Sequence, residues 1–207
     1  MATVKVRGRG TVTAQPDEAV VTFEVVAVAD AAAEAFAVAS ERANALDAVL
    51  DDAGIGAARR STVGIVLYEH QEFEPGGQPR RTHRASTTVN VRFPDPDSIP
   101  PVLREAVDRA DAYVRGPQWR LSDPTDAAAE ACRRAAADAA TRAEAYAGAL
   151  GRRLGAVEAV EEVTTRESSP VRGVALRATA AGEPPPLYPG ELEIAAAVDI
   201  VFTLEPA

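Results

Sequence analysis

The sequence predicts an α+β protein made of two intertwined, layered α/β units. Two observations support this prediction. Residues 17–121 follow the order strand, helix, strand, strand, helix, strand, which is the order of the ferredoxin-like split unit. An N-terminal strand, a long helix and two C-terminal strands remain outside this stretch. We therefore expect a ferredoxin-like unit at residues 16–121 and a discontinuous second unit made of residues 1–15 and 122–207, the two together forming one domain.

The strands of the ferredoxin-like unit are predicted from side-chain alternation and from turn residues. Val21, Phe23, Val25 and Ala27 occupy alternate positions, which is the period of a half-buried strand. Residues 72–79 are rich in Pro and Gly and predict a turn between two further strands. The four strands are expected at residues 18–29, 62–71, 82–93 and 113–121.

Two helices are predicted between these strands. The first has apolar residues at three- and four-residue steps from Phe36 to Leu50, with Asp30 as its N-cap and Gly54 as its stop. The second begins near Ser98, followed by two prolines in the first turn, where a backbone N–H has no helical partner. Its apolar residues, from Val102 to Ala110, form one face that can pack on a sheet.

Three strands are predicted in the second unit, and a long loop separates the last two. They are expected at residues 3–13, 156–165 and 191–204, the last with the cleanest alternation in the chain. Gly8 and Gly10 interrupt the first strand and indicate a bulge or the close approach of another backbone. Residues 166–189 form a polar, Pro-rich loop, and loops of this length usually carry function.

The long helix of the second unit has clear start and stop signals. Ser122 or Asp123 is expected to cap it, Pro124 to occupy its first helical position, and Gly151 to end it. Many of its inward positions are Ala. We therefore expect it to approach a sheet or another helix closely.

Composition excludes some classes of function. The chain has 207 residues, a net charge of −9 and a pI near 4.8, which disfavours binding to nucleic acid. Aromatic residues are 5% of the chain, too few for a sheet that stacks RNA bases. No apolar run approaches the ~20 residues of a membrane span. No signal segment is evident, so a cytoplasmic location is expected for this sequence, or a periplasmic or secreted one if a signal segment has been removed.

Histidines and a cysteine are the candidate metal-binding or nucleophilic residues. His70 and His83 are expected to face each other across the Pro-Gly hairpin and could bind a metal with Glu69 or Glu72, although hairpin side chains are usually solvated. Cys132 is the single cysteine and is expected to be a small buried residue of the long helix. Neither pattern amounts to a metal or cofactor motif.

Three other kinds of pattern could indicate a catalytic or binding motif. Gly8-Arg9-Gly10 lacks the third glycine and the helix of a dinucleotide-binding turn. The adjacent acids Asp51-Asp52 and Glu161-Glu162 are expected to point in different directions and to be solvated. No Gly-x-Ser-x-Gly elbow is present. The sequence therefore predicts no catalytic residue, no cofactor and no metal.

The motifs of the sequence resemble the SIMPL-domain family. The resemblance lies at residues 6–12, 15–19, 120–124, 149–157 and 189–194, in the family's order along nearly the whole chain. It implies two intertwined α/β units, a tendency to self-assemble and no established enzymatic activity. It also implies relatives of two kinds. Bacterial relatives are commonly exported and associated with the envelope or with oxidative-stress defence, and a eukaryotic relative is associated with kinase signalling.

Our leading hypothesis is a non-enzymatic homo-oligomer that supports stress tolerance or organises protein partners. Self-association is expected through sheet edges, the strand at 191–204 above all, or through the small-residue face of the helix at 124–150, with the 166–189 loop as a further contact. The alternative is a small-molecule or metal-binding module at the His70–His83 hairpin. A third hypothesis is a hydrolase whose motif is not recognised.

Overall fold

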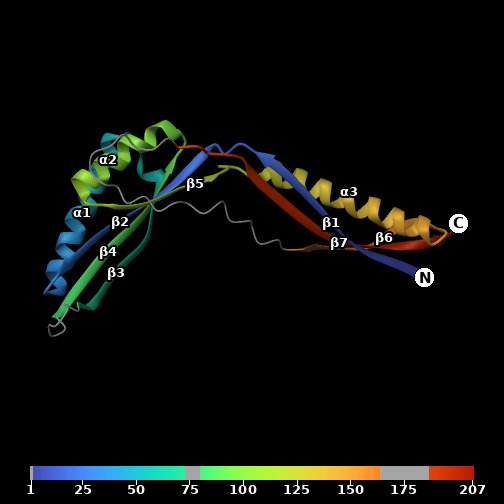
Figure 1. The fold of residues 1–207 in the computed structure, drawn as a ribbon, viewed down its shortest axis with the longest axis horizontal. Helices are drawn as coiled ribbons and strands as arrows, with labels where there is room; N and C mark the ends of the chain where they lie inside the picture. Colours follow the sequence, from blue (N-terminus) through green and yellow to red (C-terminus); the bar gives the residue numbers. More distant parts are fainter. Residues whose placement is uncertain (1, 73–79, 164–186) are drawn as a thin grey trace. The chain divides into compact units, whose positions relative to one another are not determined.

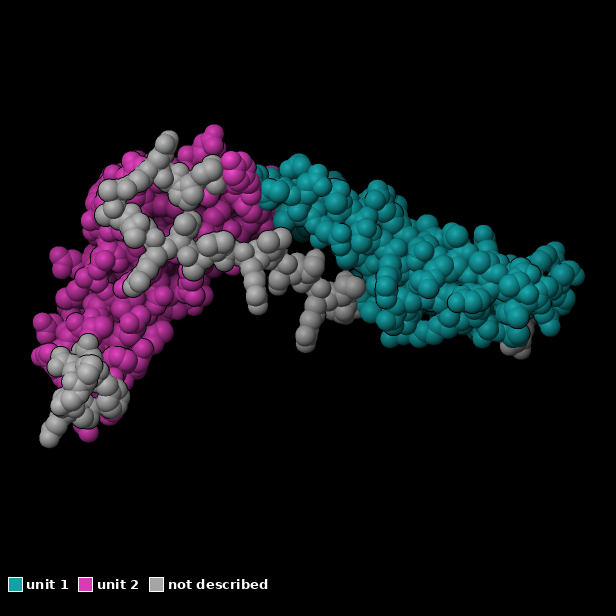
Figure 2. Space-filling view, in the orientation of Figure 1, with its two compact units in different colours: residues 1–16, 121–171, 189–207 teal, residues 17–120, 172–188 magenta. Residues whose placement is uncertain are grey.

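The computed structural model describes residues 2–72, 80–163 and 187–207. In this part of the chain, three α-helices and seven strands form two compact units, each with its own antiparallel sheet (Figure 1, Figure 2). Unit 1 contains the described residues of 2–16, 121–163 and 189–207, and unit 2 contains those of 17–120 and 187–188. The predicted α+β class is confirmed.

Unit 2 has the ferredoxin-like arrangement. Its four strands are ordered β3-β4-β2-β5, and every neighbouring pair is antiparallel. Two helices, α1 and α2, lie on one face of this sheet (Figure 1). The elements, in chain order, are β2 (Glu18–Ala29), α1 (Ala32–Asp52), the short 3-10 turn η1 (Ala57–Arg59), β3 (Arg60–Glu72), β4 (Arg80–Phe93), η2 (Pro96–Ser98), α2 (Ile99–Ala110) and β5 (Tyr113–Arg120).

The core of unit 2 lies between the helices and the two central strands. Phe23 on β2 pairs with Val89 on β4, and all the apolar residues at alternate positions of β2 from Ala19 to Ala27 are buried. Leu46 and Leu50 of α1 and Ile99 of α2 fill the space above them. The alternation read from the sequence therefore identifies the buried face of β2.

Unit 1 is a three-stranded sheet covered by one helix. Its strands are ordered β1-β7-β6, again all antiparallel. Helix α3 buries a single stripe of alanines at four-residue spacing. The elements are β1 (Ala2–Ala14), α3 (Thr125–Ala149), β6 (Arg152–Val163) and β7 (Leu192–Pro206), and the buried alanines are Ala131, Ala135, Ala139, Ala143 and Ala147.

Two glycines of β1 allow α3 to rest on the strand backbone. A Cβ placed on Gly8 would lie 2.8 Å from the Ala139 Cβ and would overlap the carbonyl oxygen of Ala135. A Cβ on Gly10 would lie 2.5 Å from the backbone nitrogen of Ala135. The close approach predicted from these glycines and from the alanines of the helix is confirmed, and β1 continues through both positions without a bulge against β7.

The helix starts differ from the prediction. Ala31 is the N-cap of α1 and no side chain caps the helix, because the Asp30 carboxylate accepts hydrogen bonds from Arg80 at 2.6 and 2.7 Å instead. At the start of α3, Pro124 is the cap residue and not the first helical residue. Asp123 accepts from the backbone N–H of Thr125 at 2.9 Å, and hydrogen bonds from Thr125 lower the pKa of Asp123.

We expect the substitution Gly8→Ala to destabilise the protein by about 1–3 kcal/mol or more, because the methyl group meets helix backbone, which cannot move aside as a side chain can. The measurement is the free energy of unfolding in urea. Gly148→Ala is the matched control: it adds the same methyl group on α3, where nothing lies within 4 Å. This control should be neutral or stabilising by up to about 1 kcal/mol. Equal stabilities of the two variants would show that α3 does not rest on β1 in this way.

Candidate functional site

The two histidines do not meet across the hairpin. His70 pairs with Thr82 and His83 pairs with Glu69, so the histidines project from opposite faces of the sheet. His83 Nδ1 lies 3.1 Å from the carbonyl oxygen of Asp30, and His70 packs edge-on against Tyr68 with ring centroids 6.3 Å apart. Within the described residues, no group of three or more His, Cys, Asp or Glu side chains is placed to hold a metal ion. The expectation that the histidines face each other is therefore wrong.

The adjacent acidic residues point apart, as predicted. Asp51 binds Arg60 of β3 at 2.5 Å, whereas Asp52 binds Arg109 of α2 at 2.8 Å. Glu161 and Glu162 lie on opposite faces of β6, because consecutive strand residues alternate. Neither pair forms a shared carboxylate site.

Cys132 is exposed, and the prediction that it is buried is wrong. The buried stripe of α3 runs through Ala131 and Ala135 at steps of four residues. Cys132 follows Ala131 by one position, which turns its side chain by about 100° away from the sheet. It lines a groove of about 260 Å³ beside Glu162 of β6. The sequence pattern predicts the helix but does not show which of its faces is buried.

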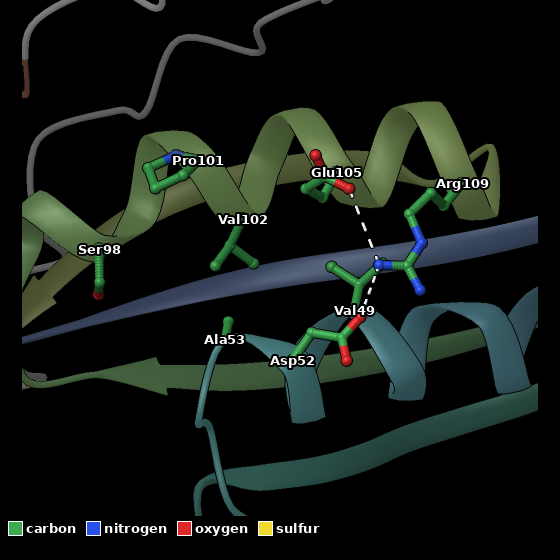
Figure 3. A pocket seen from close by; sticks show the side chains of 8 residues that line it. All are labelled: Val49, Asp52, Ala53, Ser98, Pro101, Val102, Glu105 and Arg109. Atoms are coloured by element: carbon green, nitrogen blue, oxygen red, sulfur yellow. Dashed lines mark hydrogen bonds and ion pairs between the residues drawn. The ribbon is translucent and has the colours of Figure 1, made fainter.

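A groove of about 340 Å³ lies between α1 and α2 (Figure 3). Val49, Ala53 and Val102 form its apolar floor. At one end, the Arg109 guanidinium lies 2.8 Å from Asp52 and 3.8 Å from Glu105 (Figure 3). Its hydrogen bond to Asp52 is the main cause that raises the pKa of Arg109. The charged groups of the groove are therefore bound to one another and do not converge on the open space.

The edges of the two sheets are the remaining candidate binding surfaces. A sheet edge presents unpaired backbone N–H and C=O groups that can accept another strand. The strand at 191–204, expected to be such an edge, is the central strand β7 and pairs with β1 and β6 on its two sides. The small-residue face of α3 is likewise covered, because it packs on β1. Both expected association surfaces are thus occupied within the chain. Most of the 166–189 loop lies outside the described residues.

Part of the β1 edge is covered by side chains of α3. Arg134 donates to the Thr11 carbonyl and Arg142 to the Arg7 carbonyl, each at 2.8 Å. The backbone N–H of Arg9 donates to the Asp138 carboxylate at 3.0 Å. Backbone groups of β1 from Arg7 to Thr11 are thereby bonded, and this stretch is protected against strand addition.

Two other edges carry known protective features. β5 has eight residues, is the shortest strand, and contains Pro117 and an irregularity in its pairing with β2. β6 has two irregularities in its register with β7. It also carries three exposed glutamates, Glu158, Glu161 and Glu162. Irregular register and charge both oppose the regular pairing of another strand.

The edge strand β3 lacks this protection over most of its length. After an irregularity near Val63, it pairs with β4 without a shift from Gly64 to Glu72. Between Arg60 and Glu69 it has no charged residue. Five large apolar side chains in this stretch are between 46% and 64% exposed: Val63, Ile65, Val66, Leu67 and Tyr68. Exposed apolar side chains on a long, regular edge are the features that natural sheets usually avoid.

The position of α1 explains this exposure. Ala35 and Ala39 of α1 pack on Ala85 of β4 and on Ala27 of β2. Leu67 is the register partner of Ala85, yet it is half exposed because the helix lies over the central strands. Phe36, beside Ala35 on the helix, is also half exposed. The uncharged apolar run at 63–68 was the sequence signal for this edge, and sequence reasoning missed it because alternation does not identify the outer strand.

A charged row crosses the sheet of unit 1 on the face opposite α3. Asp199 of β7 accepts two hydrogen bonds from Arg7 of β1, at 2.6 and 2.9 Å, and lies 3.4 Å from Lys5. Glu161 of β6, in register with Asp199, lies 3.7 Å from Lys5. The hydrogen bond from Arg7 is the main cause that lowers the pKa of Asp199 to about 2. This row holds the three strands together at mid-sheet.

The fold therefore defines an α+β protein with one ferredoxin-like unit and one three-stranded unit, and its distinctive surfaces are strand edges. The family described as SIMPL, protein of unknown function (DUF541), matches residues 4–202. The protein belongs to this family, as its motifs predicted. Among curated proteins, none matches the chain. No helix in the described residues is long and apolar enough to cross a membrane.

We expect Asp199→Asn to lower the free energy of unfolding at neutral pH. Folding lowers the pKa of Asp199 from 3.8 to about 2, so the ionised carboxylate stabilises the folded state above about pH 4. This stabilisation is lost as the pH falls toward about 2. The difference in stability between the wild type and the variant should therefore shrink over that interval, measured by urea unfolding at each pH. In an Arg7→Gln background, the stability difference caused by Asp199→Asn should depend less on pH. A difference that stays constant down to pH 2 would contradict the assignment.

Proposed function

We propose that the protein is a non-enzymatic, self-associating member of the SIMPL family, and that copies of it associate through the edge of β3. The observation that carries the proposal is the 46–64% exposure of five large apolar side chains on the uncharged stretch of the edge strand β3 between Arg60 and Glu69, most of which pairs regularly with β4. Pairing with another strand would satisfy the edge backbone and remove these side chains from water together.

A second copy of the chain is the partner that the edges favour. Among the described strands, the edges of β1, β5 and β6 carry protective features, and β3 is the exception. The edge of a second copy best able to pair with β3 is therefore its own β3. Two identical edges pair about a two-fold axis, which closes the contact and prevents open growth at that edge.

The sequence of β3 suits an antiparallel pairing of this kind. With Val66 opposite Val66 of the second copy, Ile65 lies opposite Leu67, so that exposed apolar residues meet. Tyr68 lies opposite Gly64, where an added Cβ would meet nothing within 4 Å. An aromatic side chain over an edge glycine is a recognised stabilising pair in sheets.

A structural role is favoured over catalysis because the candidate chemical groups are engaged with separate partners. Asp51 and Asp52 bind different arginines, and His83 contacts a backbone carbonyl. The proposed role is that of a scaffold, or of a stress-defence protein in line with the family resemblance. Assembly would then present many copies of the same surface to a protein partner.

We expect Ile65→Lys to weaken the β3 contact at least tenfold, which corresponds to about 1.4 kcal/mol or more, because each contact would bring in two charged side chains. The measurement is the mass in solution, by light scattering behind size exclusion, over a range of concentrations. Tyr113→Lys is the matched control. Ile65 is 64% and Tyr113 63% exposed, but Tyr113 lies on the protected edge strand β5.

The control should keep the wild-type mass, whereas Ile65→Lys should reduce it. Circular dichroism should show the same fold for both variants, since neither side chain is part of the core. An unchanged mass for Ile65→Lys would refute the β3 contact. A wild-type mass of one 21.7 kDa chain at every concentration would refute self-association altogether.

A further inference from the structure

One flank of α3 changes character along its length. The residues one position before the buried alanines form a stripe at four-residue spacing that begins at Glu130, and its next three members, Arg134, Asp138 and Arg142, bond to the β1 backbone. The stripe continues with Tyr146 and Leu150, which are 54% and 66% exposed. The flank of α3 that faces the β1 edge is therefore charged over one half of the strand and apolar over the other.

The apolar part of this stripe lies beside the unprotected part of β1. Helix α3 runs against the strand direction, with Ala135 near Gly10 and Gly8, and Ala143 in one cluster with Val6. Tyr146 and Leu150, which come after Ala143, therefore lie beside the first residues of β1. Here, at residues 2–6, no helix side chain bonds to the strand edge among the contacts of the described residues.

The opposite edge of the same sheet carries a matching apolar surface. Val157 of β6 is in register with Phe202 of β7, and Val160 is in register with Ile200. All four side chains lie on the face that α3 covers, yet the valines are 54% and 63% exposed while Phe202 and Ile200 are buried. Helix α3 lies over β1 and β7 and leaves β6 uncovered.

The two edges also differ in charge on the other face of the sheet. Lys5, Arg7 and Arg9 are basic and lie on β1, which has no acidic residue. On this face the second half of β6 carries Glu161, in register with Asp199, and this half of the strand has no basic residue. The β1 edge therefore combines the apolar flank of α3 with basic residues. The β6 edge combines uncovered valines with acidic charge, so the two edges are complementary.

We propose that β6 of one copy docks against residues 2–6 of β1 and the Tyr146–Leu150 flank of α3 in the next copy. The rows of the sheet favour this contact, because Val4 and Val6 share their rows with Val157 and Val160 through β7. The next copy's Tyr146 and Leu150 would cover the two valines. The contact is therefore one of side chains on the α3 face and does not need regular strand pairing along β6, whose register is irregular. Lys5 and Arg7 of the next copy would then lie on the same face of the sheet as Glu161.

This contact is head to tail, so it goes beyond the two-fold β3 contact of the proposed function and does not depend on it. Each copy uses one surface toward the preceding copy and a different surface toward the following one. Contacts of this type either close into a ring or continue as a fibre. With a net charge of −9 per chain opposing open aggregation, we expect a closed ring.

The test uses the full chain with Ile65→Lys, which removes the β3 contact, and adds one of two further substitutions. Leu150→Asp damages the helix flank, and Val160→Asp damages the β6 surface. Each variant should be a monomer by itself. A mixture of equal parts should form a species of two chains, one of each, because each variant keeps the surface that the other has lost. A two-fold contact could not be restored by mixing.

The control and the outcomes separate this inference from the proposed function. Ala145→Asp adds the same charge on α3, at a position two residues from the buried Ala143 and Ala147 and so on the solvent side, and should keep the assembly of the Ile65→Lys chain. If the mixture stays monomeric, or if Leu150→Asp alone leaves the assembly unchanged, the head-to-tail contact is refuted. In the otherwise wild-type chain, Leu150→Asp should leave a dimer through β3. If this single variant is a dimer, but the mixture of the two Ile65→Lys variants forms no species of two chains, the proposed function is retained and the head-to-tail contact is rejected.

Discussion

In each unit the helices cover only some of the strands of the sheet. The strand left uncovered therefore exposes its apolar side chains to solvent. In unit 2, α1 rests on β4 and β2 through Ala39, and β3 extends beyond it with apolar residues on both faces. In unit 1, α3 rests on β1 so closely that only glycine fits at position 8, and β6 is left uncovered. A larger residue at position 8 would lift the helix, so the same close packing that stabilises the unit also fixes which strand stays exposed.

The sheet edges differ in how well they are protected against the addition of another strand. Side chains of α3 bond to the backbone of β1 between Arg7 and Thr11, while β5 is short and contains Pro117. Such features cost little and prevent the addition of foreign strands. The lack of comparable features between Gly64 and Tyr68 of β3 is what supports the proposed contact between two copies at this edge.

In unit 1, charged side chains contribute more to the specificity of pairing than to its strength. Arg7 and Asp199 are register partners on β1 and β7, and their ion pair joins the two strands. The lowered pKa of Asp199 keeps its carboxylate ionised over the physiological pH range. The remaining charges separate by edge, basic on β1 and acidic on β6. In the proposed head-to-tail contact, this separation would orient neighbouring copies at long range, and the apolar side chains would supply most of the contact energy.

Much of the fold was determined by the sequence itself, through local patterns. Alternation located the strands, three- and four-residue spacing located the helices, and Gly8 and Gly10 predicted close packing, because each of these signals arises from neighbours along the chain. The family was recognisable for the same reason, since its motifs are turns and caps. Only the tertiary structure decided that β7 is central, that His70 and His83 point apart, and that Cys132 is exposed. These properties depend on strand order, register and the rotation of a helix about its axis, which are set by packing between residues far apart in sequence.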